Sequence, residues 1–82
     1  MRTMQVSVRV FATLCRYIPG ISAGTPVEIE LPDGVTVVDV LEKLGIPARE
    51  VKIAFVNGRT RPPDWLLKSG DEVGIFPPIG GG

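Results

Sequence analysis

The chain has 82 residues, of which 44% are hydrophobic and 22% charged, so it can form one small domain with a modest core. Nine basic and nine acidic side chains cancel, which argues against the broad cationic surface that binds nucleic acid. Without histidine and with one cysteine, the chain lacks an internal disulfide and the usual residues of a metal site or thiol nucleophile. We therefore expect no metal site, and we interpret Cys15 as a packing residue, with a reactive free thiol as the alternative.

The first predicted element is a strand near the N-terminus. Apolar and polar residues alternate there, which is typical of a strand with one buried face; the apolar positions are Met4, Val6, Val8 and Val10. Because the segment alternates, it resembles neither a secretory signal nor a membrane span. The cytoplasm is the expected compartment, with no membrane partner.

A second strand is predicted around Val27, Ile29 and Leu31, where the same alternation returns. The turn signal Pro32-Asp33-Gly34 ends it. The connection from Ala12 to Gly24 is too long for a tight hairpin, so a helical turn around residues 14–18 is plausible within it.

The next predicted element is a helix that begins at Thr36. Asp39 follows three residues later, and this spacing is typical of a capping box. Apolar residues then recur at helical intervals and predict one buried stripe: Val37, Val40, Leu41 and Leu44. Gly45 and Pro47 supply the stop.

Two further strands are predicted in the C-terminal half, with a short strand or turn between them. The apolar run 53–56 leads into the turn pair Asn57-Gly58, where the third strand ends. Arg59, Arg61 and the following prolines are assigned to a loop, and the turn 68–71 precedes a last strand over residues 72–76.

This order of elements fits an α+β domain of the ubiquitin-like β-grasp type. We expect a mixed sheet of four to five strands with one main helix across one face, formed by residues 1–76, and a flexible tail at 77–82. If the valines of the outer strands face the helix, Phe11 and Phe76 point to the opposite face. The pair is then a candidate docking surface for a partner, unless the loop over residues 62–67 covers it.

The tail reads Pro77-Pro78-Ile79-Gly80-Gly81-Gly82. Two prolines remove amide donors and stop the strand, and glycines without Cβ atoms can thread a narrow channel. At about 3.3 to 3.6 Å per extended residue, the last five residues reach roughly 16 to 18 Å from the domain. The carboxylate of Gly82 is therefore the candidate working group; a frayed, inert end is the alternative.

Several segments together resemble the MoaD family, the sulfur-carrying small subunit of molybdopterin synthase. The resemblance covers essentially the whole chain, and its most specific part is a Gly-Asp-Glu-Val turn and strand followed by Phe-Pro-Pro and a terminal diglycine. The matching segments are 11–14 (Phe-Ala-Thr-Leu), 31–37 (Leu-Pro-Asp-Gly-Val-Thr-Val), 56–59 (Val-Asn-Gly-Arg), 67–73 (Leu-Lys-Ser-Gly-Asp-Glu-Val) and 75–82 (Ile-Phe-Pro-Pro-Ile-Gly-Gly-Gly).

The resemblance implies a carrier that has no catalytic machinery of its own. A MoeB-like partner would use ATP and magnesium to adenylate the Gly82 carboxylate, a persulfide would convert it to a thiocarboxylate, and the sulfur would be delivered in a MoaE-like subunit. The slim tail Gly80, Gly81 and Gly82 would enter the partners. The expected partner contacts are Phe11, Phe76, Pro77, Pro78 and Ile79.

Other functions remain open at this level. A ThiS-like carrier for thiazole synthesis shares the diglycine but is typically shorter and lacks the Phe-Pro-Pro approach. A ubiquitin-like modifier would join Gly82 to a target lysine through the same adenylate, and an adaptor domain with an inert tail is a third reading. The sequence does not distinguish molybdenum from tungsten pathways.

Overall fold

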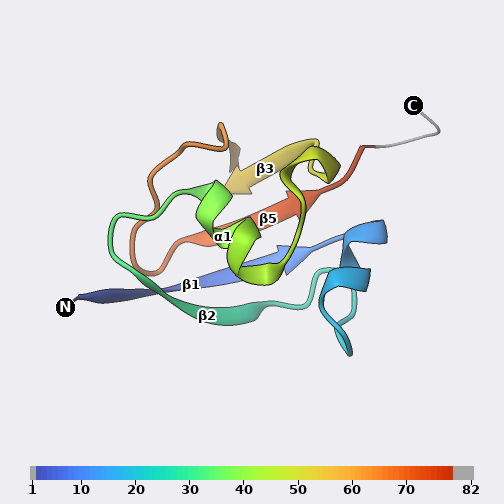
Figure 1. Ribbon diagram of the computed structural model, residues 1–82, viewed down its shortest axis with the longest axis horizontal. Helices are drawn as coiled ribbons and strands as arrows, with labels where there is room; N and C mark the ends of the chain where they lie inside the picture. Colours follow the sequence, from blue (N-terminus) through green and yellow to red (C-terminus); the bar gives the residue numbers. More distant parts are fainter. Residues whose placement is uncertain (1, 79–82) are drawn as a thin grey trace.

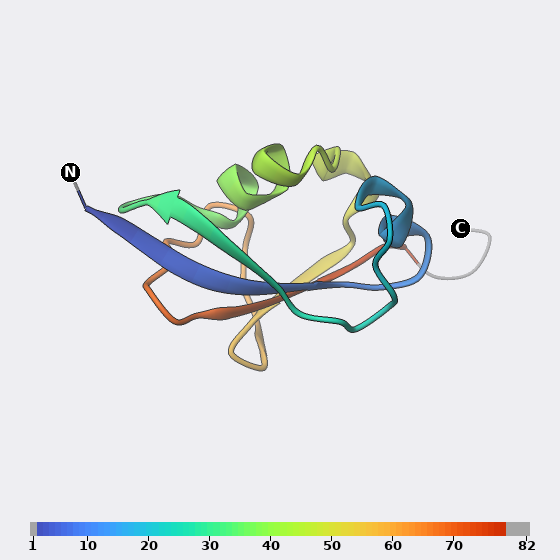
Figure 2. The same cartoon turned by 90° about the horizontal axis from the view of Figure 1, so that it is seen from below.

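A five-stranded mixed sheet carries one α-helix on one of its faces. The computed structural model describes residues 2–78 and gives the strand order β2-β1-β5-β3-β4 (Figure 1). The strands are β1 (Thr3–Val10), β2 (Val27–Pro32), β3 (Ile53–Val56), β4 (Arg59–Thr60) and β5 (Glu72–Phe76). The helices are α1 (Val37–Leu44) and two short 3-10 helices, η1 (Ala12–Tyr17) and η2 (Ala48–Glu50). Figure 2 shows α1 over one side of the sheet, as the sequence predicts.

Strands β1 and β2 pair antiparallel, and their register separates apolar from polar side chains. Val6 lies opposite Ile29 on the helix side, whereas Gln5 lies opposite Glu30 on the open side. Glu30 and the neighbouring Glu28 are exposed on β2, which forms one edge of the sheet. Charged side chains on an edge strand oppose pairing with another chain.

Strands β1 and β5 pair in parallel in the middle of the sheet, with Val8 opposite Val73 and Val10 opposite Ile75. Parallel neighbours run in the same direction, so β1 and β5 both finish at the same end of the sheet (Figure 1). The residue that follows β1 and the last residue of β5 are thereby brought together. This pairing positions the site described below.

Helix α1 begins and ends where the sequence predicts. The backbone N–H of Thr36 donates to the carboxylate of Asp39 at 2.8 Å, which is one half of a capping box. Gly45 ends the helix in the left-handed conformation with φ 75°, which glycine adopts without steric cost.

The core lies between the sheet and α1. The predicted apolar stripe of the helix is buried there, except for Leu44, which is half-buried. The buried residues are Met4, Val6, Val8, Val10, Leu14, Leu31, Val37, Val40, Leu41, Ile46, Ala54, Val56, Leu67, Val73 and Ile75. Over residues 2–78, no helix is both long and apolar enough to cross a bilayer.

Two local predictions differ from the structure. The loop assignment of Arg59 is wrong, because Arg59 and Thr60 form β4 and pair with β3. Asn57 and Gly58 both have positive φ, 54° and 84°, as a two-residue hairpin turn requires, and the chain therefore returns along β3. The predicted helical turn at residues 14–18 exists, but it is the 3-10 helix η1 and begins at Ala12.

Candidate functional site

Three phenylalanines form an aromatic patch on the open face of the sheet. Phe11 and Phe76 stack in parallel, with ring centroids 4.2 Å apart and an angle of 5° between their planes. Phe55 meets Phe76 edge-on, at 5.4 Å and 80°. All three rings are half-buried, so they keep apolar surface available to another molecule. The prediction that Phe11 and Phe76 share the open face is confirmed.

Gly74 lies in β5 beneath these rings. It pairs with Phe55 on one side and with Arg9 on the other. A Cβ atom at Gly74 would lie 3.6 Å from the ring of Phe76 and 3.9 Å from that of Phe11. Since glycine supplies no side chain, the aromatic rings lie close over the strand backbone and cover it.

A shallow hollow joins the patch to charged neighbours, because Arg9 and Glu72 both line it together with the three rings. The loop over residues 62–67 does not cover this face. Its backbone is hydrogen-bonded to the first turn of α1, where Val38 N–H donates to the carbonyl of Pro63 at 3.0 Å. The alternative, that this loop covers the phenylalanines, is therefore wrong.

The chain leaves the sheet directly beside the aromatic patch. Lys52 N–H donates to the carbonyl of Phe76 at 2.8 Å, and the two following prolines have no N–H groups to continue the ladder. Pro77 is buried and Pro78 is exposed. Of the two prolines predicted as partner contacts, Pro78 is therefore the accessible one, and its contact with a partner stays a prediction.

The remaining predicted tail residues are Ile79, Gly80, Gly81 and Gly82, and they lie outside the described residues. Their roles, including that of the Gly82 carboxylate, stay predictions. The structure brings together the other predicted contacts: Phe11, Phe76 and Pro78 lie at or next to the end of β5.

A polar cluster ties η1 to η2 at this same end of the molecule. Glu50 accepts hydrogen bonds from Tyr17 at 2.5 Å and from Arg16 at 2.7 Å. The Tyr17 bond holds the pKa of Glu50 below its usual 4.5; partial burial opposes this effect and the Arg16 charge adds to it. The cluster fixes η1, which follows Phe11 directly, against the segment that leads into β3.

Phe55 and the Arg16–Tyr17–Glu50 cluster were not predicted. The run at residues 53–56 is apolar throughout, so its alternation gives no sign that Phe55 faces away from the core. The cluster joins positions more than thirty residues apart, for which a single sequence carries no signal. Within residues 2–78, no three side chains of metal-ligating type gather to hold an ion.

Cys15 packs against the core, in agreement with its interpretation as a packing residue. Its Sγ lies 3.6 Å from the carbonyl oxygen of Val10, as a thiol donor to that group. The side chain is half-buried.

The sheet order, the single covering helix and the chain exit at the end of β5 define a ubiquitin-like β-grasp protein. A family model described as the ThiS family matches residues 8–82. The chain therefore belongs to the ThiS family. No curated protein matches it significantly.

Solved structures of archaeal proteins have the same fold. The HVO 2177 protein of Haloferax volcanii has a TM-score of 0.75 at 28% identity, over 98% of this chain and 88% of that one. A Pyrococcus furiosus protein provisionally assigned as molybdopterin converting factor, subunit 1, has a TM-score of 0.70 at 30% identity, over 93% and 99%. SAMP1 of H. volcanii has a TM-score of 0.71 at 22% identity, over 95% and 99%, which shows the fold alone.

Proposed function

We propose that this chain is a cytoplasmic sulfur carrier for molybdopterin synthesis, which works through the carboxylate of Gly82. The observation that carries the proposal is the family match, which extends to the terminal glycines. The fold supports it, because the aromatic patch lies at the end of the parallel pair β1 and β5, where the chain leaves the sheet.

The chemistry follows from the low reactivity of a carboxylate. A MoeB-like enzyme would join the Gly82 carboxylate to the AMP part of magnesium-bound ATP, with pyrophosphate as the leaving group. A persulfide sulfur would then form a C–S bond as the C–O bond to AMP breaks, and a thiol would cleave the S–S bond. The product is a thiocarboxylate, whose sulfur is a strong nucleophile toward a pterin precursor in a MoaE-like subunit.

The described residues would act in docking and delivery. The aromatic patch of Phe11, Phe55 and Phe76 offers apolar area to both partners, and the flanking Arg9 and Glu72 can fix the orientation. Pro78 begins the delivery arm. In this scheme the protein contributes the nucleophile, and the partners would contribute the acid–base groups.

The molybdopterin pathway is favoured over thiazole synthesis by two observations. The strand β5 runs into Phe76-Pro77-Pro78, the approach that resembles MoaD, and the P. furiosus structure is similar over almost its full length at 30% identity. The tail chemistry is the same in either pathway.

Adenylation provides the direct test. The chain is incubated with a MoeB-like enzyme, magnesium, ATP and labelled pyrophosphate, and label exchange into ATP is measured. We expect exchange with the natural chain and none with a chain extended by one alanine after Gly82, because the extension moves the carboxylate. Equal exchange with both chains would contradict the proposal.

Pathway and modifier functions are separated by the fate of the activated tail. Supplied as its thiocarboxylate, the chain should convert the pterin precursor to molybdopterin when mixed with a MoaE-like subunit. Higher-mass conjugates in cells that vanish when Gly82 is deleted, without this conversion, would instead identify a protein modifier.

A further inference from the structure

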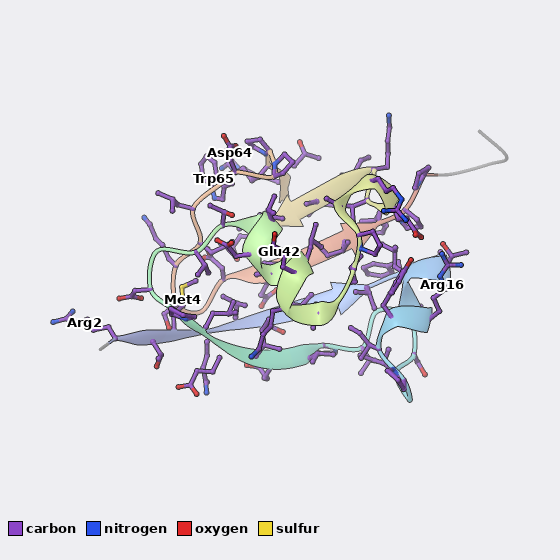
Figure 3. The ribbon with its side chains drawn as sticks, viewed as in Figure 1. Arg2, Met4, Arg16, Glu42, Asp64 and Trp65 are labelled. Carbon is purple, nitrogen blue, oxygen red and sulfur yellow. The ribbon has the colours of Figure 1, made fainter. Side chains whose placement is uncertain are left out.

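A second exposed surface lies around Trp65, at the opposite end of the molecule from Arg16 (Figure 3). The Trp65 surface consists of Arg59, Arg61, Trp65, Leu66 and Lys68, which line one hollow. The hairpin turn at residues 57–58 borders both sites, because Asn57 lines this hollow and Gly58 lines the hollow at the aromatic patch. None of the five residues belongs to that patch, so the inference is independent of the proposed function.

The backbone that presents the Trp65 surface is held firmly. Val37 N–H at the start of α1 donates to the carbonyl of Trp65 at 3.2 Å. Leu67 N–H donates to the carbonyl of Val35 at 3.0 Å, and Leu66 forms an isolated bridge with Thr36. Helix donors that would otherwise lack partners thus fix the loop. The preorganised loop needs little ordering when it binds.

Large apolar side chains point outward from this fixed loop. Leu66 is 61% exposed and Trp65 is 37% exposed, and they are two of the three large hydrophobic residues classed as exposed over residues 2–78. The third, Ile53, lies elsewhere on β3. Two adjacent exposed apolar residues on rigid backbone indicate an interaction surface, and tryptophan is prominent at binding hot spots.

The charges around these residues are mainly positive. The guanidinium of Arg61 lies 4.1 Å from the centre of the Trp65 ring, a cation–π contact that preorganises both side chains. Between residues 2 and 78 the one ion pair joins Arg16 to Glu50, so the three cations of the surface are free of such pairs. Asp64 adds an opposing charge.

A second nearby acid, Asp71, already forms hydrogen bonds within the protein. It accepts hydrogen bonds from the side chain of Asn57 at 2.9 Å and from Lys68 N–H at 2.8 Å. The charge that the surface offers to a partner is therefore mainly that of Arg59, Arg61 and Lys68.

We infer that the Trp65 surface binds an acidic segment of a partner protein that carries a large apolar side chain. The apolar side chain would pack on Trp65 and Leu66, and carboxylates would meet Arg59, Arg61 and Lys68. The hollow, at about 230 Å³, is smaller than the roughly 300 Å³ at which small-molecule sites begin. It suits one inserted side chain.

Charge also favours a protein segment over nucleic acid. Three cations beside two acids, on a chain with no net charge, cannot neutralise an extended run of phosphates. A surface of this kind would let the protein hold one partner while its aromatic patch stays free for another.

The test is an NMR titration of the full-length, ¹⁵N-labelled chain with a capped peptide that alternates aspartate and leucine. We expect the largest shifts at the Trp65 indole N–H and at the amides of Arg59 and Leu66, and none at Phe76. Peptides with lysine in place of aspartate, or serine in place of leucine, should not bind.

Matched variants locate the binding energy. Arg61→Glu should weaken peptide affinity about tenfold, since an ion pair becomes a repulsion and the cation–π contact is lost. Leu66→Ser should weaken it several-fold, and Arg2→Glu, an equal charge change on a side chain that points away from the surface in Figure 3, should leave it unchanged. The spectra report folding, and Lys68→Glu replaces Arg61→Glu if that variant unfolds.

Three results would overturn the inference. The first is the absence of saturable shifts with the aspartate–leucine peptide. The second is an equal loss of affinity in Arg2→Glu and Arg61→Glu, which would reduce the effect to net charge. The third is tighter binding of a single-stranded oligonucleotide than of the peptide at the same residues.

Discussion

Adjacent side chains at the end of β5 lie on opposite faces of the sheet. Ile75 is fully buried against the helix, whereas Phe76 is half-buried in the aromatic patch. Strand geometry imposes this division, because successive side chains point to opposite faces of a sheet. Stability and docking can therefore be separated by substitutions one position apart.

Phe76→Ala should reduce the free energy of unfolding by about 1 to 2 kcal/mol, because it removes a half-buried ring from a stacked cluster. Ile75→Ala should reduce it by about 2 to 5 kcal/mol, because it empties a core position. Urea denaturation of both variants measures the difference, and binding to a MoeB-like enzyme should weaken in Phe76→Ala. A loss in Phe76→Ala as large as that in Ile75→Ala would mean that Phe76 belongs to the core.

The lowered pKa of Glu50 predicts a pH dependence of stability. A carboxyl whose pKa is lower in the folded state stabilises the fold above its unfolded pKa, and this contribution is lost as pH falls through the folded value. The stabilisation by Glu50 should therefore begin to decrease as the pH falls to about the usual pKa of 4.5, and it should decrease further below that pH. Tyr17→Phe removes the main cause of the shift, so stability should fall less steeply over this pH range than in the natural chain.

The measurement is the unfolding midpoint at a series of pH values from neutral to below 4.5. Arg49→Ala serves as the control, because Arg49 is the smallest of the influences on Glu50. Parallel pH profiles for the natural chain and Tyr17→Phe would show that the Tyr17 bond does not lower the pKa.

Among the secondary-structure elements, β5 contributes most to the proposed site. It lies between β1 and β3, pairs with both, and ends in Phe76. Its one glycine, Gly74, leaves the three rings room to lie over the strand. The strand thus lies at the centre of the sheet and beneath the aromatic patch.

Gly74→Ala should leave stability unchanged or raise it by about 0.4 to 1 kcal/mol, because the added Cβ meets only ordinary contacts and restricts the unfolded chain. The same methyl raises the floor of the aromatic patch, so binding to the MoeB-like enzyme should weaken. Thermal unfolding and a binding titration test the two effects separately. A variant that binds as tightly as the natural chain would show that partners do not contact this floor.

The strands with polar alternation and the capped helix could be predicted from the sequence because each pattern is local. Alternation also predicted the shared face of Phe11 and Phe76. The third ring, Phe55, was missed because its strand is apolar on both faces, and β4 was missed because two residues carry no periodicity. The position of the 62–67 loop depends on hydrogen bonds to the first turn of α1, which only the folded chain brings within reach.

At the scale of the whole molecule, the proposed docking and delivery site and the Trp65 surface are two separate surfaces. The parallel pairing of β1 and β5 positions the aromatic patch. The hydrogen bonds between α1 and the loop over residues 62–67 position the Trp65 surface. Both surfaces lie on one small domain. Sulfur transfer through Gly82 is the central claim, and it depends on chemistry at a single carboxylate.

Intact-mass spectrometry tests this claim most directly. After incubation with a MoeB-like enzyme, ATP and a persulfide donor, the chain should gain about 16 Da as sulfur replaces oxygen, and fragmentation must assign the gain to Gly82 because methionine oxidation has the same nominal mass. Met1 and Met4 are the positions to exclude. A gain confined to Gly82 is the predicted result, and an unchanged Gly82 in the presence of an active enzyme would contradict the account.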